Sequence, residues 1–175
     1  MAQTIDRAPY FGQVEPNHLS AQRNGQIYGQ LKADDDINVL ENGQFVFYDY
    51  AKGKVIVNPA KASDQNMERF MVFNEVKLYK DFWQESYKDF AMQRKDFTAE
   101  GMTPRVIKTN VGDLMTTTTV AADSYEIGDV LTPGSDGILA KGNGAMEWTV
   151  VKSISGSDIN TMPDGTPAVK LQRTK

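Results

Sequence analysis

Short runs of apolar and β-branched residues recur along most of the chain, separated by turn residues. Four of them lie in the first half: GQIYGQLKA, QFVFYDY, KVIVNP and RFMVFNEVKLY. Runs of this length, rich in Val, Ile, Phe and Tyr and bounded by Gly, Asn and Asp, are typical of β-strands. QFVFYDY and KVIVNP predict a hairpin, because Gly53 between them can adopt the positive φ that a tight turn requires. The pattern predicts a mainly β protein.

The second half of the chain repeats this order of strands and turns. NGQFVFYDYAKGKVIV carries turn glycines at Gly43 and Gly53, and IGDVLTPGSDGILAK carries them at Gly128 and Gly137. A closing run follows each pair, MVFNEVKLY in the first half and EWTVVKSIS in the second. Internal duplication is one interpretation, and chance spacing of turns in an all-β protein is the other. Duplication predicts that Gly43 is equivalent to Gly128 and Gly53 to Gly137.

This interpretation divides the chain into two related β modules, barrel-like or sandwich-like, at residues 26–79 and 108–175. Residues 1–25 show neither a strand nor a helix period and contain Pro and Gly, so they predict an extended N-terminal arm. The arm carries Tyr10 and Phe11, which have no evident core of their own. We expect them either to bind a partner or to fold back on their own domain.

Residues 80–107 form a connector between the predicted modules, and most of it has helical character. Its sequence KDFWQESYKDFAMQRKDFTAEGMTP spaces aromatic residues at helical intervals and ends in Gly and Pro, which predicts one short helix. The aromatic stripe consists of Phe82, Trp83, Tyr87 and Phe90. It is expected to pack on the parent sheet, with a partner-facing role as the alternative.

Composition and charge narrow the possible functions. A net charge of -4 and a sequence pI near 5.0, with Lys and Arg scattered, argue against a nucleic-acid partner. The sequence has no apolar run long enough to span a membrane, and MAQTIDRAPY lacks the order of a signal peptide. We therefore expect a protein made in a cytoplasm. The absence of cysteine excludes disulfides and thiolate chemistry, so stability depends on packing or on a partner.

No constellation of catalytic or metal-binding residues is evident. His18 lies in the irregular arm without an identifiable partner, which indicates a surface histidine. The cluster Asp34-Asp35-Asp36 could attract a cation, but ADDDINVLENGQ does not match the ligand pattern of an EF-hand and indicates a solvated turn. We therefore expect no enzyme activity, no cofactor and no metal site.

The order of an extended arm, the strand-and-turn segment GDVLTPGSDGILAK and the closing strand EWTVVKSIS resembles bacteriophage head-decoration (cement or minor capsid) proteins. The resemblance is clearest over residues 111–155 and fainter over 26–79. It implies a structural virion protein that binds the outside of an assembled capsid and stabilises it by bridging subunits. The implied partners are the major capsid protein and neighbouring copies of this chain, without nucleic acid or membrane.

A ligand-binding module, for example one that binds carbohydrate, is the alternative. Trp148, Tyr125 and Tyr48 would then form an exposed platform on which a sugar ring could stack. The same strand positions are equally suited to a hydrophobic core, and no cluster of acids or amides accompanies them.

Overall fold

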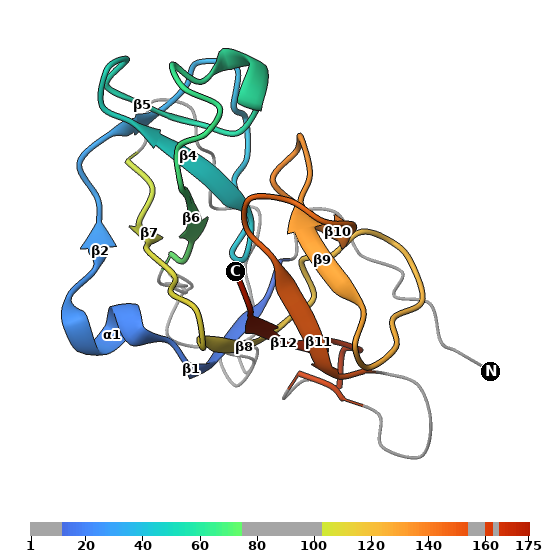
Figure 1. Cartoon of the computed structure of the whole chain (residues 1–175). Coiled ribbons are helices and arrows are strands. Elements are labelled where there is room, and N and C mark those ends of the chain that lie inside the picture. The colour runs from blue at the N-terminus through green and yellow to red at the C-terminus, as the bar shows by residue number, and fades with distance from the viewer. Residues whose placement is uncertain (1–11, 75–102, 154–159, 163–164) are drawn as a thin grey trace, which may run out of the picture.

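The computed structural model describes residues 12–74, 103–153, 160–162 and 165–175 (Figure 1). Its strands form two six-stranded sheets, and among these strands neither sheet closes into a barrel. The first sheet has the order β2-β7-β6-β4-β5-β3: β2 (Ile27–Tyr28), β3 (Lys32–Ala33), β4 (Phe45–Asp49), β5 (Lys54–Ile56), β6 (Arg69–Val72) and β7 (Val106–Ile107). The second has the order β1-β8-β12-β11-β9-β10: β1 (Val14–His18), β8 (Leu114–Thr117), β9 (Val130–Pro133), β10 (Leu139–Lys141), β11 (Trp148–Lys152) and β12 (Val169–Arg173).

Helix is scarce in the described part of the chain. It consists of α1 (Ser20–Asn24) and a single 3-10 turn (Pro59–Lys61). Gly25 ends α1 in the left-handed conformation, with φ 65°. The prediction of a mainly β fold is therefore confirmed.

The two sheets share one topology. The series β2-β7-β6-β4-β5 in the first corresponds to β8-β12-β11-β9-β10 in the second, and all neighbours in both series are antiparallel. Each series also has a parallel neighbour at its end, because β3 pairs with β5 and a parallel bridge joins Val120 to Leu139 of β10. We refer to β2–β7 as the first module and to β8–β12 as the second. Internal duplication is confirmed at the level of the fold.

Matching hydrogen bonds and turns fix the register of this equivalence. The N–H of Gly43 donates to a carbonyl of β6 over 2.9 Å, and the N–H of Gly128 donates to a carbonyl of β11 over 2.9 Å. Gly43 and Gly128 have φ values of 86° and 96°, and the hairpin glycines Gly53 and Gly137 have 66° and 75°. These are backbone conformations that glycine adopts readily, so the spacing in the sequence reflects a real constraint.

The observed strands differ from the prediction at two boundaries, the end of the first module and the end of the N-terminal arm. β7, expected within the connector 80–107, pairs with β6 and β2 and is therefore the last strand of the first module. β1, expected within the arm 1–25, pairs with β8 at the edge of the second sheet. Both segments are too short or too polar to show a strand period, so their pairing depends on partners distant in sequence. The predicted helix, with its aromatic stripe, lies outside the described residues.

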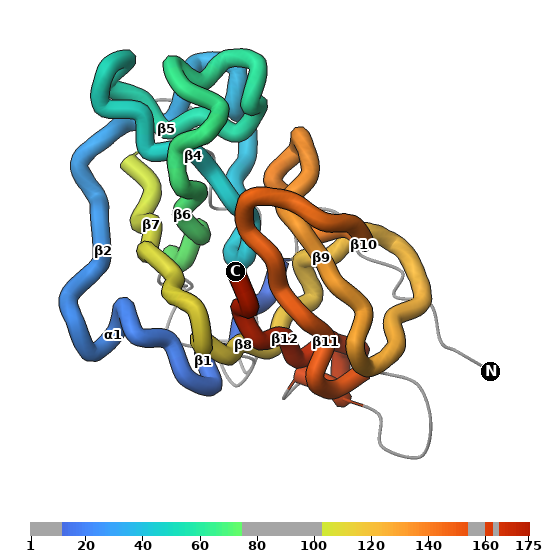
Figure 2. The backbone as a smooth tube through the Cα atoms, in the orientation of Figure 1, coloured from blue at the N-terminus to red at the C-terminus, as the bar shows by residue number. Residues whose placement is uncertain are grey.

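The two modules have separate but adjoining cores. The first consists of Ala33, Ile37, Leu40, Val46, Tyr48, Val55, Val72 and Val106. The second, with residues of α1 and of the first module, consists of Leu19, Ala21, Phe45, Met71, Ile107, Met115, Val120, Tyr125, Leu131, Leu139, Met146, Trp148, Val150, Val169 and Leu171. The two sheets lie side by side, and the chain ends between them (Figure 2).

Candidate interaction surfaces

The predicted partner-binding residues Tyr10 and Phe11 lie outside the described residues. The chain that follows them is fixed on the second module. The N–H of Gln13 donates to the Thr118 hydroxyl over 3.0 Å, and the N–H of Thr118 donates to the Gln13 carbonyl over 3.1 Å. A role for Tyr10 and Phe11 in binding stays a prediction.

The polar residues considered for chemistry lie on the surface. His18 is exposed at the end of β1. In the acidic turn, Asp35 binds Lys54 over 2.6 Å and Asp36 binds Lys61. The hydrogen bond from Lys61 lowers the pKa of Asp36, as expected for a charged, paired turn. Among the described residues, no group of three or more His, Cys, Asp or Glu side chains could hold a metal ion.

The ligand-binding alternative predicted an exposed aromatic platform of Trp148, Tyr125 and Tyr48, and the structure contradicts it. Trp148 and Tyr125 are both 0% exposed and Tyr48 is 3% exposed, because all three point into module cores. Burial raises the pKa of Tyr125, whose hydroxyl donates to the Ala121 carbonyl. None of the three can stack on a ligand from solvent.

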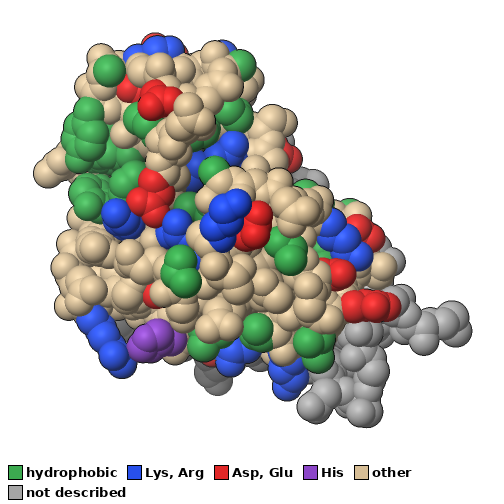
Figure 3. Space-filling model, in the orientation of Figure 1, with side chains coloured by type: hydrophobic (Ala, Val, Ile, Leu, Met, Phe, Trp, Pro, Cys, Tyr) green, Lys and Arg blue, Asp and Glu red, His purple; other side chains and the backbone are tan. Residues whose placement is uncertain are grey.

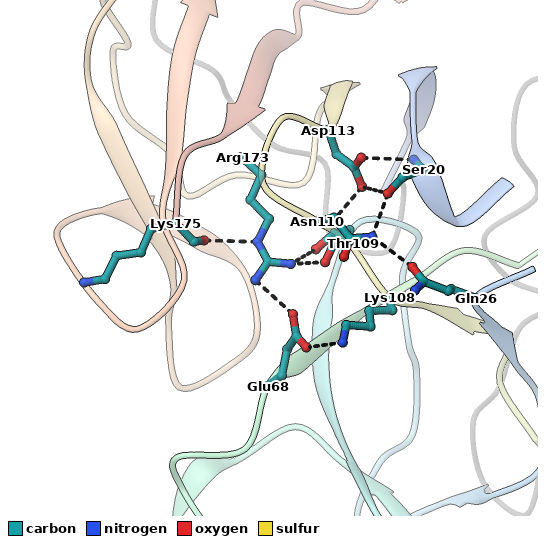
Figure 4. Close-up of polar contacts among 9 residues, drawn as sticks. All are labelled: Ser20, Gln26, Glu68, Lys108, Thr109, Asn110, Asp113, Arg173 and Lys175. Carbon is teal, nitrogen blue, oxygen red and sulfur yellow. Dashed lines mark hydrogen bonds and ion pairs between the residues drawn. The ribbon is translucent and has the colours of Figure 1, made fainter. Parts of the chain in front are cut away.

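A polar network joins the C-terminal strand of the second module to the first module (Figure 4). Arg173 is only 8% exposed, and its guanidinium contacts Glu68 over 2.9 Å. Lys108 approaches the other oxygen of the same carboxylate over 3.1 Å. Arg173 also donates to the hydroxyl of Thr109 over 3.0 Å and to its carbonyl. Since Glu68 belongs to one module and Arg173 to the other, this network holds the modules together.

The segment that links β7 to β8 is held by the same network. Asp113 accepts hydrogen bonds from the N–H of Ser20 over 3.0 Å and from its hydroxyl over 3.1 Å. The amide of Asn110 donates to the Ser20 hydroxyl over 2.7 Å and to Gln26 over 2.8 Å. These contacts seat α1 against the linker between the modules (Figure 4).

Apolar side chains also pack closely across the junction between the two modules. Phe45, Met71 and Ile107 of the first module, which we call its back face, belong to the core cluster of the second. The rings of Phe45 and Trp148 lie 5.9 Å apart, centroid to centroid. The back face of the first module therefore covers the core of the second.

Backbone contacts fix the position of the back face. The N–H of Phe45 donates to the carbonyl of Gly137 over 2.8 Å. A Cβ atom at Gly137 would lie 2.2 Å from the carbonyl oxygen of Phe45. Arg69 extends this contact, because its guanidinium donates to the Gly134 carbonyl over 2.6 Å. Glycine at position 137 thus allows the two modules to approach each other.

The first module has an aromatic surface on the opposite side of its sheet. We call this the aromatic face, formed by Tyr28, Leu31, Tyr48, Tyr50 and Phe70. Tyr50 is 64% exposed, whereas Tyr48 beneath it is 3% exposed. Tyr28 meets Phe70 edge-on at 5.2 Å between ring centroids, and Tyr48 meets Tyr50 at 5.1 Å. Hydrophobic side chains gather at the upper left of Figure 3, in the region of β2.

Only part of this surface has a signal in the sequence. Tyr50 directly follows the apolar strand β4 and precedes a turn, a position at which a large aromatic residue is often exposed. Nothing in the sequence distinguished Tyr28 and Phe70 from core residues, because both lie in strands of the expected composition.

A groove of ≈ 350 Å³ lies between the acidic turn and the second module's Asp136. Several of its polar groups are already engaged within the protein. Asp36 pairs with Lys61, and the side-chain amide of Gln44 donates to the backbone carbonyl of Asp136 over 2.8 Å. We assign no ligand to this groove.

Comparisons with known proteins place no family or homologue beside this chain. No family model, no curated protein and no solved structure matches it. In the part of the chain that the structure describes, no helix is long and apolar enough to cross a membrane.

Proposed function

We propose that this chain is a structural virion protein that binds the outside of an assembled phage capsid and bridges its subunits. The observation that carries the proposal is the duplication of a β module whose two copies are fixed in one orientation. Arg173 and Glu68 clamp the junction, and Phe45 packs into the neighbouring core. Two modules held in one orientation present two different surfaces at a fixed distance, and a protein that bridges capsid subunits needs two such surfaces.

The sequence resemblance to head-decoration proteins is compatible with the observed local structure. The segment Gly128–Lys141 folds as β9, a turn at Gly137 and β10, and β11 follows as its closing strand. The proposed partners are the major capsid protein and neighbouring copies of this chain. The proposed location is the virion, and the proposed role involves no cofactor and no catalytic step.

A bridging protein stabilises the assembled shell by mass action. A protein that binds the assembled shell and not its separated subunits shifts the equilibrium toward the shell, and repeated contacts on a closed surface add through effective concentration. Shells prepared with and without this protein should therefore be heated in parallel. We expect decorated shells to rupture at a higher temperature. Equal rupture temperatures, without co-sedimentation of the protein, would contradict the proposal.

The ligand-binding alternative now depends on Tyr50, since the aromatic residues first considered for it are buried. An exposed tyrosine ring can stack on a sugar. A glycan array with the whole chain tests this alternative, and binding that is lost in Tyr50→Ser would favour it over the capsid role.

A further inference from the structure

Three asparagines in the sequence are followed directly by glycine: Asn24, Asn42 and Asn143. Such a pair can modify itself, because the backbone nitrogen of the glycine can attack the side-chain carbonyl carbon (Cγ) of the asparagine and expel ammonia. Glycine leaves this nitrogen sterically open, and the attack becomes easier where a base accepts the proton of the nitrogen. The structure places the three glycine nitrogens in different surroundings, so we expect the three pairs to differ in reactivity.

The pair Asn42-Gly43 is fixed at both of its reacting groups. The side-chain oxygen of Asn42 accepts a hydrogen bond from the N–H of Asn74 over 2.7 Å, and its side-chain amide donates to the Asn74 carbonyl over 3.1 Å. The N–H of Gly43 donates to the Val72 carbonyl over 2.9 Å. A fixed side chain and a nitrogen that faces a neutral carbonyl should make this pair slow to react.

The pair Asn24-Gly25 lies at the end of α1. Asn24 is exposed and is the last residue of the helix, and the N–H of Gly25 donates to the Ala21 carbonyl. Attack by this nitrogen would break the hydrogen bond and move Gly25 out of the left-handed cap of the helix. The acceptor is again a neutral carbonyl, which is a weak base. This pair should therefore also react slowly.

The pair Asn143-Gly144 lies in the loop between β10 and β11. Asn143 is exposed, and within the described part of the chain its side chain makes no hydrogen bond. The N–H of Gly144 donates to the carboxylate of Glu147 over 3.1 Å. A carboxylate at this distance is within reach of the proton that the attack must remove. Of the three glycine nitrogens, that of Gly144 is therefore the one that faces a charged acceptor.

Contacts within the second module fix both the glycine and the carboxylate. A Cβ atom at Gly144 would lie 2.3 Å from the hydroxyl oxygen of Thr132, so this position strongly favours glycine. The N–H of Thr174 donates to the Glu147 carbonyl over 2.9 Å, and Lys175 approaches the Glu147 carboxylate over 3.4 Å. Lys175 also donates to the Gly144 carbonyl over 2.8 Å. Glu147 is thus held beside the Gly144 nitrogen.

We propose that Asn143 is a self-modifying site and that Glu147 is its general base. The Glu147 carboxylate accepts the proton of the Gly144 nitrogen as this nitrogen forms a bond to Cγ of Asn143. The bond from Cγ to Nδ2 then breaks, and the same proton leaves with Nδ2 as ammonia. Water opens the resulting five-membered imide at one of its two carbonyl groups, which gives aspartate or isoaspartate. The reaction consumes only water and does not depend on the proposed function.

Each conversion adds a negative charge to this loop, and isoaspartate also lengthens the backbone by a methylene group. The new charge lies beside Lys175, whose ammonium contacts the Gly144 carbonyl. Because Asn143 is exposed, the core of the second module is not disturbed. The surface charge of the second module therefore changes with the age of the protein.

The test follows the three asparagines in the whole folded chain during incubation at neutral pH and physiological temperature. Peptide mass spectrometry distinguishes aspartate from asparagine at each position, and chromatography separates isoaspartate from aspartate. In the folded chain we expect Asn143 to convert at least about ten-fold faster than Asn24 and Asn42. In urea, the three rates should lie within about three-fold of one another, because unfolding removes the contacts that distinguish the pairs.

Two variants test the role of Glu147. Glu147→Gln keeps an oxygen that can accept the Gly144 N–H and removes the negative charge, so the rate at Asn143 should fall at least about ten-fold. Lys175→Met is the matched control, because it removes the ion pair with Glu147 and leaves the carboxylate in place. Its rate at Asn143 should stay within about three-fold of that of the unchanged protein.

Each outcome decides one part of the proposal. Equal rates at the three asparagines of the folded chain, or faster conversion at Asn24 or Asn42, would overturn Asn143 as the site. An unchanged rate in Glu147→Gln, or an equal loss in Lys175→Met, would overturn Glu147 as the base. Urea midpoints verify that both variants are folded. If Glu147→Gln does not fold, the comparison of the three asparagines in the unchanged chain still decides the site.

Discussion

The close approach at Gly137 gives the strongest test of how the modules dock. Gly137→Ala places a methyl group at a residue with φ 75°, where its Cβ would lie 2.2 Å from the backbone oxygen of Phe45. Gly53→Ala is the matched control, because Gly53 is the equivalent hairpin glycine with φ 66° and no atom within 4 Å of such a Cβ. Both variants incur the left-handed backbone penalty, and only the first creates a clash.

The expected magnitudes follow from these contacts. A left-handed alanine costs about 1–2 kcal/mol at either site. At Gly137 the clash adds about 1–3 kcal/mol of overpacking, and loss of the hydrogen bond from the Phe45 N–H adds about 1 kcal/mol. We therefore expect the free energy of unfolding to fall by about 3–6 kcal/mol for Gly137→Ala and by about 1–2 kcal/mol for Gly53→Ala.

Urea denaturation followed by far-UV circular dichroism measures both values. If the clash separates the modules, the transition of Gly137→Ala should also broaden, since two uncoupled modules no longer unfold as one unit. Equal destabilisation by the two substitutions would refute the reasoning, because it would mean that Phe45 does not approach Gly137 this closely in solution.

Two further predictions concern charged groups. Arg173→Met should lower the free energy of unfolding by about 2–3 kcal/mol, because it leaves Glu68 and Thr109 without their buried donor. Lys108→Met, at the equivalent and more exposed position, should lower it by less than about 1 kcal/mol, and equal losses in urea denaturation would contradict the role of Arg173 in joining the modules. Burial opposes ionisation of Asp49, but hydrogen bonds from the N–H groups of Ser63 (2.7 Å) and Lys52 (3.1 Å) outweigh this effect and lower the pKa of Asp49. The stabilisation by Asp49 should therefore be present above about pH 4 and be lost as the pH falls through the lowered pKa. In a series of urea midpoints against pH, the curve of Asp49→Asn should be flatter than that of the unchanged protein, and an unchanged slope would exclude this role.

The features that the sequence predicted correctly depend on local constraints. Gly43, Gly53, Gly128 and Gly137 occupy turns with positive φ, so their spacing follows directly from backbone sterics. The hairpins and the order of strands follow from that spacing. This is why the duplication could be recognised although few residues are identical.

Features that depend on distant partners could not be predicted. Glu68 and Arg173 are 105 residues apart, and no local pattern marks them as a pair. β1 and β7 acquire strand geometry from β8 and from β2 and β6. Strand alternation does not reveal which face of a sheet another module will cover, so the sequence cannot decide between a core position and a binding surface for Trp148.

One sequence signal does distinguish the faces of the two modules. A strand buried on both sides is apolar at consecutive positions, whereas a strand with one solvated side alternates. β7, Val106–Ile107, is apolar and buried at both positions, whereas the equivalent positions of β12 hold a buried Leu171 and a partly exposed Gln172. The first module therefore has a covered back face and the second a partly solvated one. The asymmetry of β7 and β12 therefore matches the direction of the packing, in which the back face of the first module covers the core of the second.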